Sequence, residues 1–269
     1  MTDRTMTDRS TTRAAAAIAW TKFALFAMLV VGGIAYGAAQ MNYAWKWHQV
    51  PRFIVRVIDG TFYPGPLLKG LVVTLEISVV SFLLALAIGL ATALCRLSDS
   101  VVARFLSRCY LELVRNTPLL VQIYLLYFVL APILNFDRWF AAVFALAVFE
   151  GAFAAEIFRG GILSVPRGQT EAAMSLGLGR AQAYRLVIIP QAVRIMLPPL
   201  TSLGVSLIKH SAIVSAIAMF DLFNEARTIV SETFLSYEIY LTTGAIYLAV
   251  TLTLSLLVTA LERRLARPG

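Results

Sequence analysis

Charged residues are scarce in this chain. Asp, Glu, Lys and Arg make up 14% of the 269 residues, whereas 59% are hydrophobic, and soluble domains carry about 25% charged residues. This scarcity excludes an ordinary soluble domain and indicates that lipid surrounds the chain. Cysteine is also rare, because only Cys95 and Cys109 are present, which excludes a disulfide framework. His48 and His210 lack the spacing of metal ligands, so we expect no metal site.

Signatures of nucleotide and nucleic acid binding are missing as well. No G-x-x-x-x-G-K-[ST] loop occurs, so we expect the chain to bind no ATP itself, to bind no cofactor and to be no enzyme. The net charge of +8 would suggest nucleic acid in a soluble protein. Here the arginines gather at the ends of apolar segments, which is typical of the cytoplasmic side of a membrane protein. We therefore expect a lipid membrane, and no nucleic acid, as a partner.

Six apolar segments are long enough to cross a hydrocarbon core, which takes about 20 residues. The four uncharged segments are Phe23–Trp45, Ile77–Cys95, Asn116–Phe136 and Ile239–Leu261. Two more segments contain one charge each: residues 139 to about 163 include Glu150, and Ile195–Phe220 includes Lys209. The first segment is too long for the core of a signal peptide and is expected to be retained. The predicted fold class is an all-α polytopic membrane protein with six transmembrane helices.

The distribution of Lys and Arg predicts the orientation of these helices. With the N-terminus inside, 16 of the 23 basic residues lie on the cytoplasmic side and 6 on the outer side, while Lys209 lies within a span. Both termini are then cytoplasmic, as tails 1–22 and 262–269. The polar stretch 166–190, between the fourth and fifth helices, is also cytoplasmic.

This polar stretch, 166–190, predicts a short helix pair. Thr170 can cap a first helix and place Glu171 in its first turn, where a carboxylate is favoured. Gly177 and Gly179 break this helix, a second one runs from Arg180 to about residue 187, and Pro190 marks the return to the membrane. The apolar side chains in the stretch have little to cover them; these are Met174, Leu176, Leu178 and Leu186. They indicate a protein partner or, alternatively, a hairpin that lies on the lipid surface.

The spacing Glu171-Ala172-Ala173-x3-Gly177-x9-Val187-x-Ile189-Pro190 resembles the EAA signature of ABC-importer permease subunits, EAA-x3-G-x9-I-x-L-P. The resemblance implies a type I importer (MetI-like) permease core. It also implies that this loop docks into a groove on a cytoplasmic ABC ATPase dimer, which uses ATP and Mg²⁺, and that it passes nucleotide-driven closure to the membrane helices. The implied coupling residues are Glu171, Ala172, Ala173, Gly177 and Pro190.

Four longer stretches resemble the polar amino acid branch of this family: 70–98, 110–128, 149–173 and 197–223. With them the resemblance covers a core at 67–261 and leaves 23–45 as an extra N-terminal helix. It implies a bacterial inner-membrane protein with a second permease subunit, copy or paralogue, and an extracytoplasmic amino-acid-binding protein. Overall similarity favours acidic amino acids or their amides as substrates. Where the branch reads Lys-Asp/Asn-Ser/Thr-Ser, this chain reads Lys209-His210-Ser211-Ala212, so polar contacts at 210 and 212 do not carry over.

Three ionisable residues lie deep in the predicted spans, where they usually face a cavity or a partner. We expect Glu76, Glu150 and Lys209 to line the substrate path, with a carboxylate facing the ammonium of an amino acid and Lys209 facing its carboxylate. The alternatives are a structural Glu–Lys pair and a charge at a subunit interface. Glu156 and Arg159, at i and i+3, are expected to form a local pair.

The segment Arg115, Asn116, Thr117 and Pro118 is the last candidate site. It reads as an anchor and a helix start, because proline is tolerated in a first helical turn, or as a gate or interface contact. Two other functions remain open for the whole chain. A channel or ion-coupled carrier needs no spaced EAA loop, and an integral membrane enzyme needs a cluster of reactive side chains that is not visible here.

Overall fold

The computed structural model describes residues 4–41 and 43–265, and the chain divides into two compact units, 1–45 and 46–269. The first unit is one long helix, α1 (Arg4–Gln40). Its apolar part, 18–40, is long enough to cross a membrane and is not buried within the chain. The helix thus begins inside the predicted tail 1–22, where alanines favour helix, and ends before the predicted limit at Trp45.

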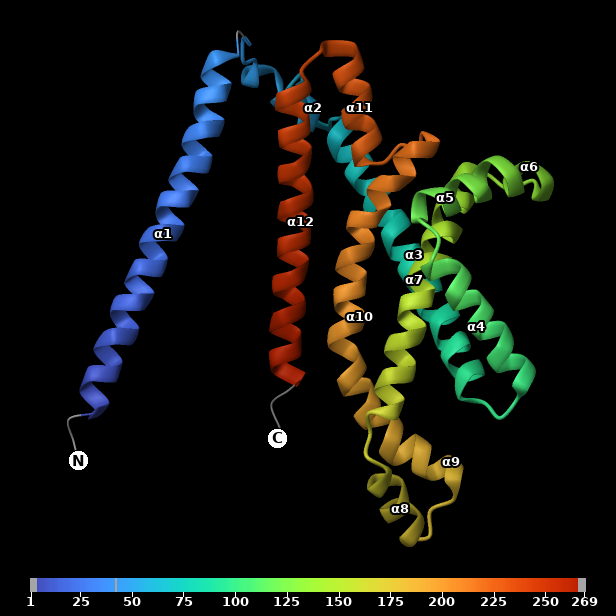
Figure 1. Ribbon diagram of the computed structural model, residues 1–269. Coiled ribbons are helices and arrows are strands. Elements are labelled where there is room, and N and C mark those ends of the chain that lie inside the picture. The colour runs from blue at the N-terminus through green and yellow to red at the C-terminus, as the bar shows by residue number, and fades with distance from the viewer. Residues whose placement is uncertain (1–3, 42, 266–269) are drawn as a thin grey trace. The chain divides into compact units, whose positions relative to one another are not determined.

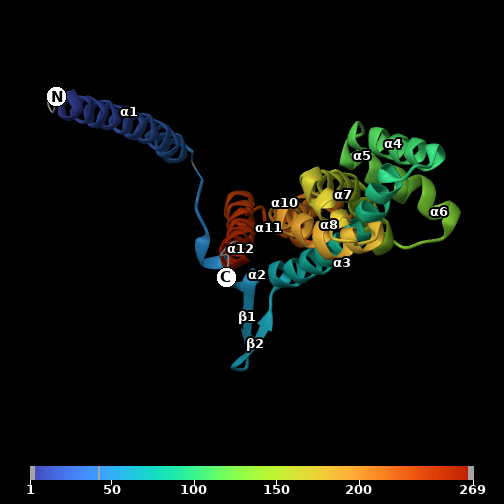
Figure 2. The same cartoon turned by 90° about the horizontal axis from the view of Figure 1, so that it is seen from below.

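The second unit opens with a β-hairpin that the all-α prediction did not include. After η1 (Trp47–Gln49) and α2 (Pro51–Ile54), β1 (Val55–Ile58) pairs antiparallel with β2 (Thr61–Pro64), as Figure 2 shows. Asp59 and Gly60 join the strands with φ angles of 49° and 75°. Positive φ at both central residues is what a type I′ turn requires, and Asp-Gly is a strong signal for it.

The rest of this unit is helical (Figure 1). Its elements are α3 (Pro66–Leu97), α4 (Val101–Arg115), α5 (Leu119–Tyr124), η2 (Leu125–Leu130), α6 (Ala131–Leu134), α7 (Arg138–Leu163), α8 (Arg167–Ser175), α9 (Arg180–Ala183), η3 (Tyr184–Ile188), α10 (Ile189–Ser211), η4 (Ala212–Ile217), α11 (Leu222–Thr233) and α12 (Ser236–Leu265). Within 4–41 and 43–265, five helical segments are long and apolar enough to span a membrane, and a bent pair makes up to six. The predicted helix count is confirmed on this basis.

The third predicted span, 116–136, differs most from the structure. It is a bent pair, in which α4 and the stretch Leu119–Leu134 meet at 105°. At 1.5 Å per residue that stretch reaches only about 24 Å, less than the ~30 Å of a hydrocarbon core. The bend falls at Pro118, which cannot continue the hydrogen-bond ladder of α4. A span at this place therefore needs α4 as well.

Helices α3 and α7 form the centre of the second unit and run in the same direction. Both lead from the hairpin end, the end with β1, β2 and α11, to the loop end, the end with α8 and α9 (Figure 1). A Cβ on Gly89 would lie 2.6 Å from the Ala154 Cβ and 2.9 Å from the Ala155 nitrogen. Glycine at 89 therefore lets the two backbones approach closely.

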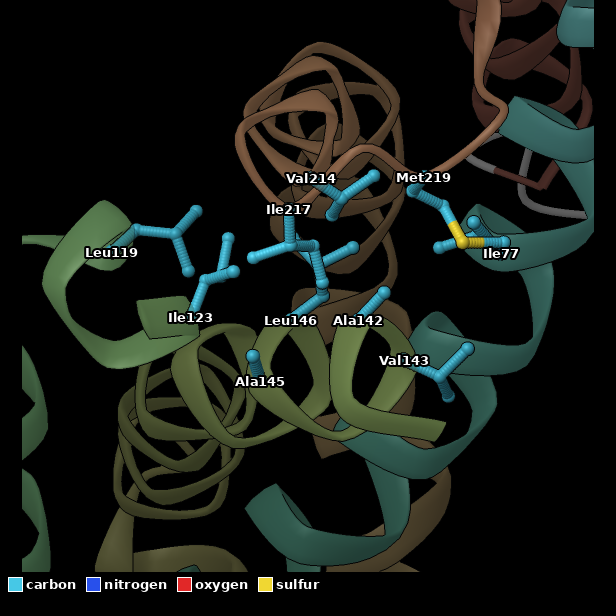
Figure 3. Close-up of a cluster of buried hydrophobic side chains, with 10 residues drawn as sticks. All are labelled: Ile77, Leu119, Ile123, Ala142, Val143, Ala145, Leu146, Val214, Ile217 and Met219. Atoms are coloured by element: carbon cyan, nitrogen blue, oxygen red, sulfur yellow. The ribbon is translucent and has the colours of Figure 1, made fainter. Parts of the chain in front are cut away.

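An apolar cluster fixes α5 and η4 against these central helices (Figure 3). Its buried members are Ile77, Leu119, Ile123, Ala142, Val143, Ala145, Leu146, Val214, Ile217 and Met219. Helix α10 packs against α7 and α3, and α12 packs against α10 and α11. The contact of α10 with α7 forms the wall from which the site described below is built.

Helix α11 begins at a buried N-cap carboxylate. Asp221 is fully buried and accepts hydrogen bonds from the backbone N–H groups of Phe223 (3.1 Å) and Asn224 (3.3 Å). The Tyr247 hydroxyl is buried beside Asp221 and Thr74. Burial raises the pKa of Asp221 to about 7, although its two backbone donors favour the carboxylate. The cap is therefore half-protonated near neutral pH.

The raised pKa of Asp221 predicts a stability that depends on pH. The folded chain holds this proton more tightly than the unfolded chain, so its contribution is complete below about pH 4 and is lost as pH rises through 7. Asp221→Asn keeps the cap and removes the titration. We expect the wild type to lose on the order of 5 °C more than Asp221→Asn in melting temperature between pH 5 and pH 8.

Thermal melts of the purified chain at several pH values measure this difference. Asp221→Ala is the matched control, because it removes the cap as well and should be about 1 kcal/mol less stable than Asp221→Asn at every pH. Parallel pH profiles for the wild type and Asp221→Asn would contradict the prediction.

Candidate functional site

The polar stretch 166–190 folds into two short helices at the loop end. Its first helix, α8, begins at Arg167 after Pro166, whose extended ψ of 138° sets the start. Thr170 consequently lies inside α8, and no acidic residue occupies the first turn. The predicted cap at Thr170 is therefore wrong, because Pro166, four residues upstream, already occupies the N-cap position.

A glycine ends α8 in the way the sequence indicates. Gly177 has a φ of +82°, its N–H donates to the Met174 carbonyl (2.9 Å), and the Leu178 N–H donates to the Ala173 carbonyl (3.2 Å). This hydrogen-bond pattern is a Schellman motif, which needs a residue in the left-handed region. The chain thus reverses sharply after α8, and the predicted break at Gly177 is confirmed.

The second half of the loop is continuous with a membrane helix. After Gly179 the short helix α9 passes through a π-helical turn, η3, directly into α10, with Pro190 in the first turn of α10. The predicted second helix therefore does not end near 187. Gln191 Nε2 donates to the Val187 carbonyl (2.9 Å) and to Gln169 Oε1 (3.4 Å), which joins α8 to the start of α10.

The loop exposes large apolar side chains and one carboxylate. Met174, Leu176 and Leu186 are 48%, 83% and 60% exposed, whereas Leu178 is half-buried. Glu171 and Ala172 are also exposed, while Ala173 is buried on the inner side of α8. Large apolar side chains in this number on so short a segment mark an interaction surface.

A second feature lies between α7 and α10. Glu150 is 2% exposed, and its Oε1 lies 2.5 Å from Nδ1 of His210. The pair borders a hollow of about 250 Å³, which is lined by Glu150, Phe153, Pro199, Ser202, Leu203, Ser206 and His210. We call it the α7–α10 hollow. Its polar groups are one buried carboxylate, one imidazole and two hydroxyls among apolar walls, the composition of a small-molecule site.

A neighbouring hollow opens on the other side of the same two serines. It measures about 260 Å³ and is lined by Ser202, Val205, Ser206, Lys209, Ser255, Val258 and Thr259, so that α12 forms its far wall. Ser202 and Ser206 line both hollows, and we call this shared pair the polar track. Glu150 lines the hollow on one side of the track, and Lys209 lines the hollow on the other.

The structure brings only part of the predicted substrate path together. Glu150 and Lys209 line adjoining hollows, whereas Glu76 is exposed on α3 and lines neither of the two. Among the described residues, no ion pair joins Lys209 to a carboxylate. The partner of Glu150 is His210, which the sequence analysis left without a role. The signal for it was the spacing of Ser202, Ser206 and His210 at i, i+4 and i+8, which places them on one helix face.

The segment 115–118 forms the bend between α4 and α5. Asn116 Nδ2 donates to Glu112 Oε2 (2.9 Å), and the Thr117 hydroxyl donates to the Leu113 carbonyl (2.6 Å). Pro118 precedes the first residue of α5. These contacts end one helix and begin the next, so the helix-start interpretation accounts for the local structure.

Arg115 belongs to an ion cluster at Glu156. The carboxylate of Glu156 contacts Arg115 (3.4 Å), Arg159 (3.0 Å) and Arg96, three guanidinium groups from α4, α7 and α3. The expected Glu156–Arg159 pair is confirmed. The other two arginines are 41 and 60 residues away in sequence, and no local pattern predicts them.

Comparison with known proteins assigns the chain to a family. The family described as binding-protein-dependent transport system inner membrane component matches residues 85–267. The octopine transport system permease protein OccM of Rhizobium radiobacter is 36% identical over 207 residues, which are 73% of this chain and 84% of the relative. The glutamine transport system permease protein GlnP of Escherichia coli is 36% identical over 202 residues, 74% of this chain and 92% of the relative.

Solved structures agree with this assignment. The chain is similar to one in the crystal structure of an amino acid ABC transporter with histidines, with a TM-score of 0.70 and 39% identity over 74% of this chain and 94% of that one. The EAA spacing lies on the exposed loop, and the region matched by the family runs from within α3 to α12. The chain therefore belongs to the family of binding-protein-dependent transport system inner membrane components, the permease subunits of ABC importers.

Proposed function

We propose that this permease subunit imports polar amino acids, with acidic amino acids or their amides as the preferred class, by alternating access driven through the α8–α9 loop. The observation that carries the proposal is the loop itself. It combines the EAA spacing with an exposed carboxylate and three exposed apolar side chains, and it continues without a break into α10.

The proposal assigns separate roles to the partners. A cytoplasmic ATPase dimer would bind ATP and Mg²⁺ and receive the loop through Glu171, Ala172 and the exposed apolar side chains. A second permease subunit, copy or paralogue, would complete the pathway, and an extracytoplasmic binding protein would deliver the amino acid. Both termini would then be cytoplasmic. Arg115, in the ion cluster, would help to hold the inner side closed.

The substrate would pass through the α7–α10 hollow. The Glu150–His210 pair and the two serine hydroxyls can accept hydrogen bonds from the ammonium group of an amino acid, and the lysine beside the same serines can bind its carboxylate. The similarity to GlnP supports an amide substrate. Glu76 would act outside this hollow, on the exposed face of α3, where a second permease subunit could meet it.

Reconstitution tests the proposal. The chain is co-expressed with the ATPase and binding protein of its own transport system, and uptake of labelled glutamine, glutamate and aspartate into proteoliposomes is measured. We expect uptake that requires ATP and the binding protein. Uptake that an ion gradient drives without the ATPase would instead support a secondary carrier.

Glu76 is tested separately in the same assay. If it contributes to the substrate path, Glu76→Gln should reduce uptake several-fold while the ATPase activity of the complex persists, because the loop is unchanged. Unaltered uptake would remove Glu76 from the path.

A further inference from the structure

The Glu150–His210 contact is the most unusual feature of the α7–α10 hollow. The Glu150 side chain is 3% exposed and the His210 side chain is 40% exposed, with 2.5 Å between Oε1 and Nδ1. The Phe149 ring meets the imidazole edge-on, with 5.8 Å between ring centroids. His210 is thus held between Glu150 and Phe149, and its exposed side faces the hollow.

The charge of this pair follows from the burial of Glu150. A buried carboxylate is costly unless a cation or a proton neutralises it. Among the described residues, Nδ1 of His210 is the one polar partner of this carboxylate. His210 therefore supplies within the chain the neutralisation that a bound cation would otherwise supply.

The other charges around the hollow are positive. Lys209 lies across the shared Ser202–Ser206 track, and the Arg115 guanidinium lies 5.9 Å from the centre of the Phe153 ring, which lines the hollow. Glu156, the nearest further carboxylate on α7, is occupied by three arginines. A cationic side chain in the hollow would thus find like charges and no free carboxylate among the lining residues.

We propose that His210, by neutralising Glu150, restricts the α7–α10 hollow to amino acids whose side chains are uncharged or anionic, and excludes cationic ones. The inference rests on the proposed function, because it takes the hollow as the substrate path. It makes His210 a specificity-determining residue. Without its imidazole, Glu150 would become an unpaired carboxylate that selects for a positive side chain.

The test uses the purified permease–ATPase complex without the binding protein, so that the binding protein cannot filter the substrates. Binding of labelled glutamine is competed with unlabelled glutamate and with arginine. In the wild type, arginine should compete at least about tenfold more weakly than glutamine. In His210→Asn, the competition by arginine, relative to that by glutamine, should become about tenfold stronger or more.

A rescue variant separates this role from a structural one. The double variant His210→Asn with Glu150→Gln restores a neutral pair and should return the preference to that of the wild type. If His210→Asn had merely misfolded the site, the second substitution would not restore the preference. Asp99→Asn removes an exposed carboxylate that lines neither hollow and should leave the ratio unchanged.

Two outcomes distinguish a failure of the inference about His210 from a failure of the proposed function. If His210→Asn and the wild type discriminate equally against arginine, the inference about His210 fails, while ATP-dependent uptake by the wild type still supports the proposed function. If the wild-type complex shows no ATP-dependent uptake of any amino acid, the proposed function fails, and with it the inference.

Discussion

Glu171→Lys is expected to reduce ATP-driven uptake by at least tenfold and to release the ATPase from the complex. Glu171 is exposed on α8 and forms no ion pair within the described part of the chain. Charge reversal there leaves the fold intact but places a cation where the partner would meet a carboxylate, which costs about 2–5 kcal/mol at a desolvated contact. The measurement is a pull-down of the membrane-expressed chain, scored for the co-purifying ATPase, with uptake assayed in the same membranes.

Asp99→Lys is the matched control for this variant. Asp99 is also exposed and lies in the short turn between α3 and α4, so its reversal changes the net charge equally without touching the α8–α9 loop. The control should keep both the ATPase and uptake. If Glu171→Lys behaves like Asp99→Lys, the loop is not the docking surface.

Glu156→Gln is expected to cause the largest loss of stability. Three guanidinium groups converge on this one carboxylate, and its removal leaves them to repel one another. The side chains are 23% to 46% exposed, so solvent screens the repulsion, and we expect a cost of about 2 kcal/mol. A fall of about 5 °C in melting temperature should result.

Melts of the detergent-purified chain measure this cost. Glu156→Asp keeps the charge and should recover most of the loss. Glu112→Gln is the matched control, because Glu112 bonds only to its neighbour Asn116 among the contacts described for its side chain. A melting temperature equal to that of the wild type in Glu156→Gln would show that the ion cluster does not hold α3, α4 and α7 together.

Elements that local sequence determines were predictable, whereas features that depend on contacts between distant residues were not. Segments such as α3 and α7 were predictable because an apolar run between charges is a local property. The bend at Pro118 was missed because two polar residues do not end an apolar run by composition alone. The β-hairpin was not predicted, although Asp59-Gly60 is a strong signal for its turn, because apolar runs of about 20 residues identify membrane spans and not short strands.

The sites show the same division. The helix break at Gly177 was predictable, because the positive φ angle at such a helix end favours glycine. The Glu150–His210 contact was not, because 60 residues separate its partners and only the packing of α10 on α7 brings them together. Helical periodicity puts His210 on one face with Ser202 and Ser206, but it does not say what that face contacts, and the sequence analysis assigned His210 no role.

The unbroken path from α9 through η3 into α10 has a mechanical consequence. The backbone is helical from the α8–α9 loop to the α7–α10 hollow, so under the proposed function α10 would act as a lever whose short arm carries the loop. Pro198 and Pro199 lie inside this helix and remove two of its internal hydrogen bonds, which creates a hinge. Pro199 itself lines the hollow. A rotation imposed at the loop would therefore bend the lever at a joint that is also part of the cavity wall.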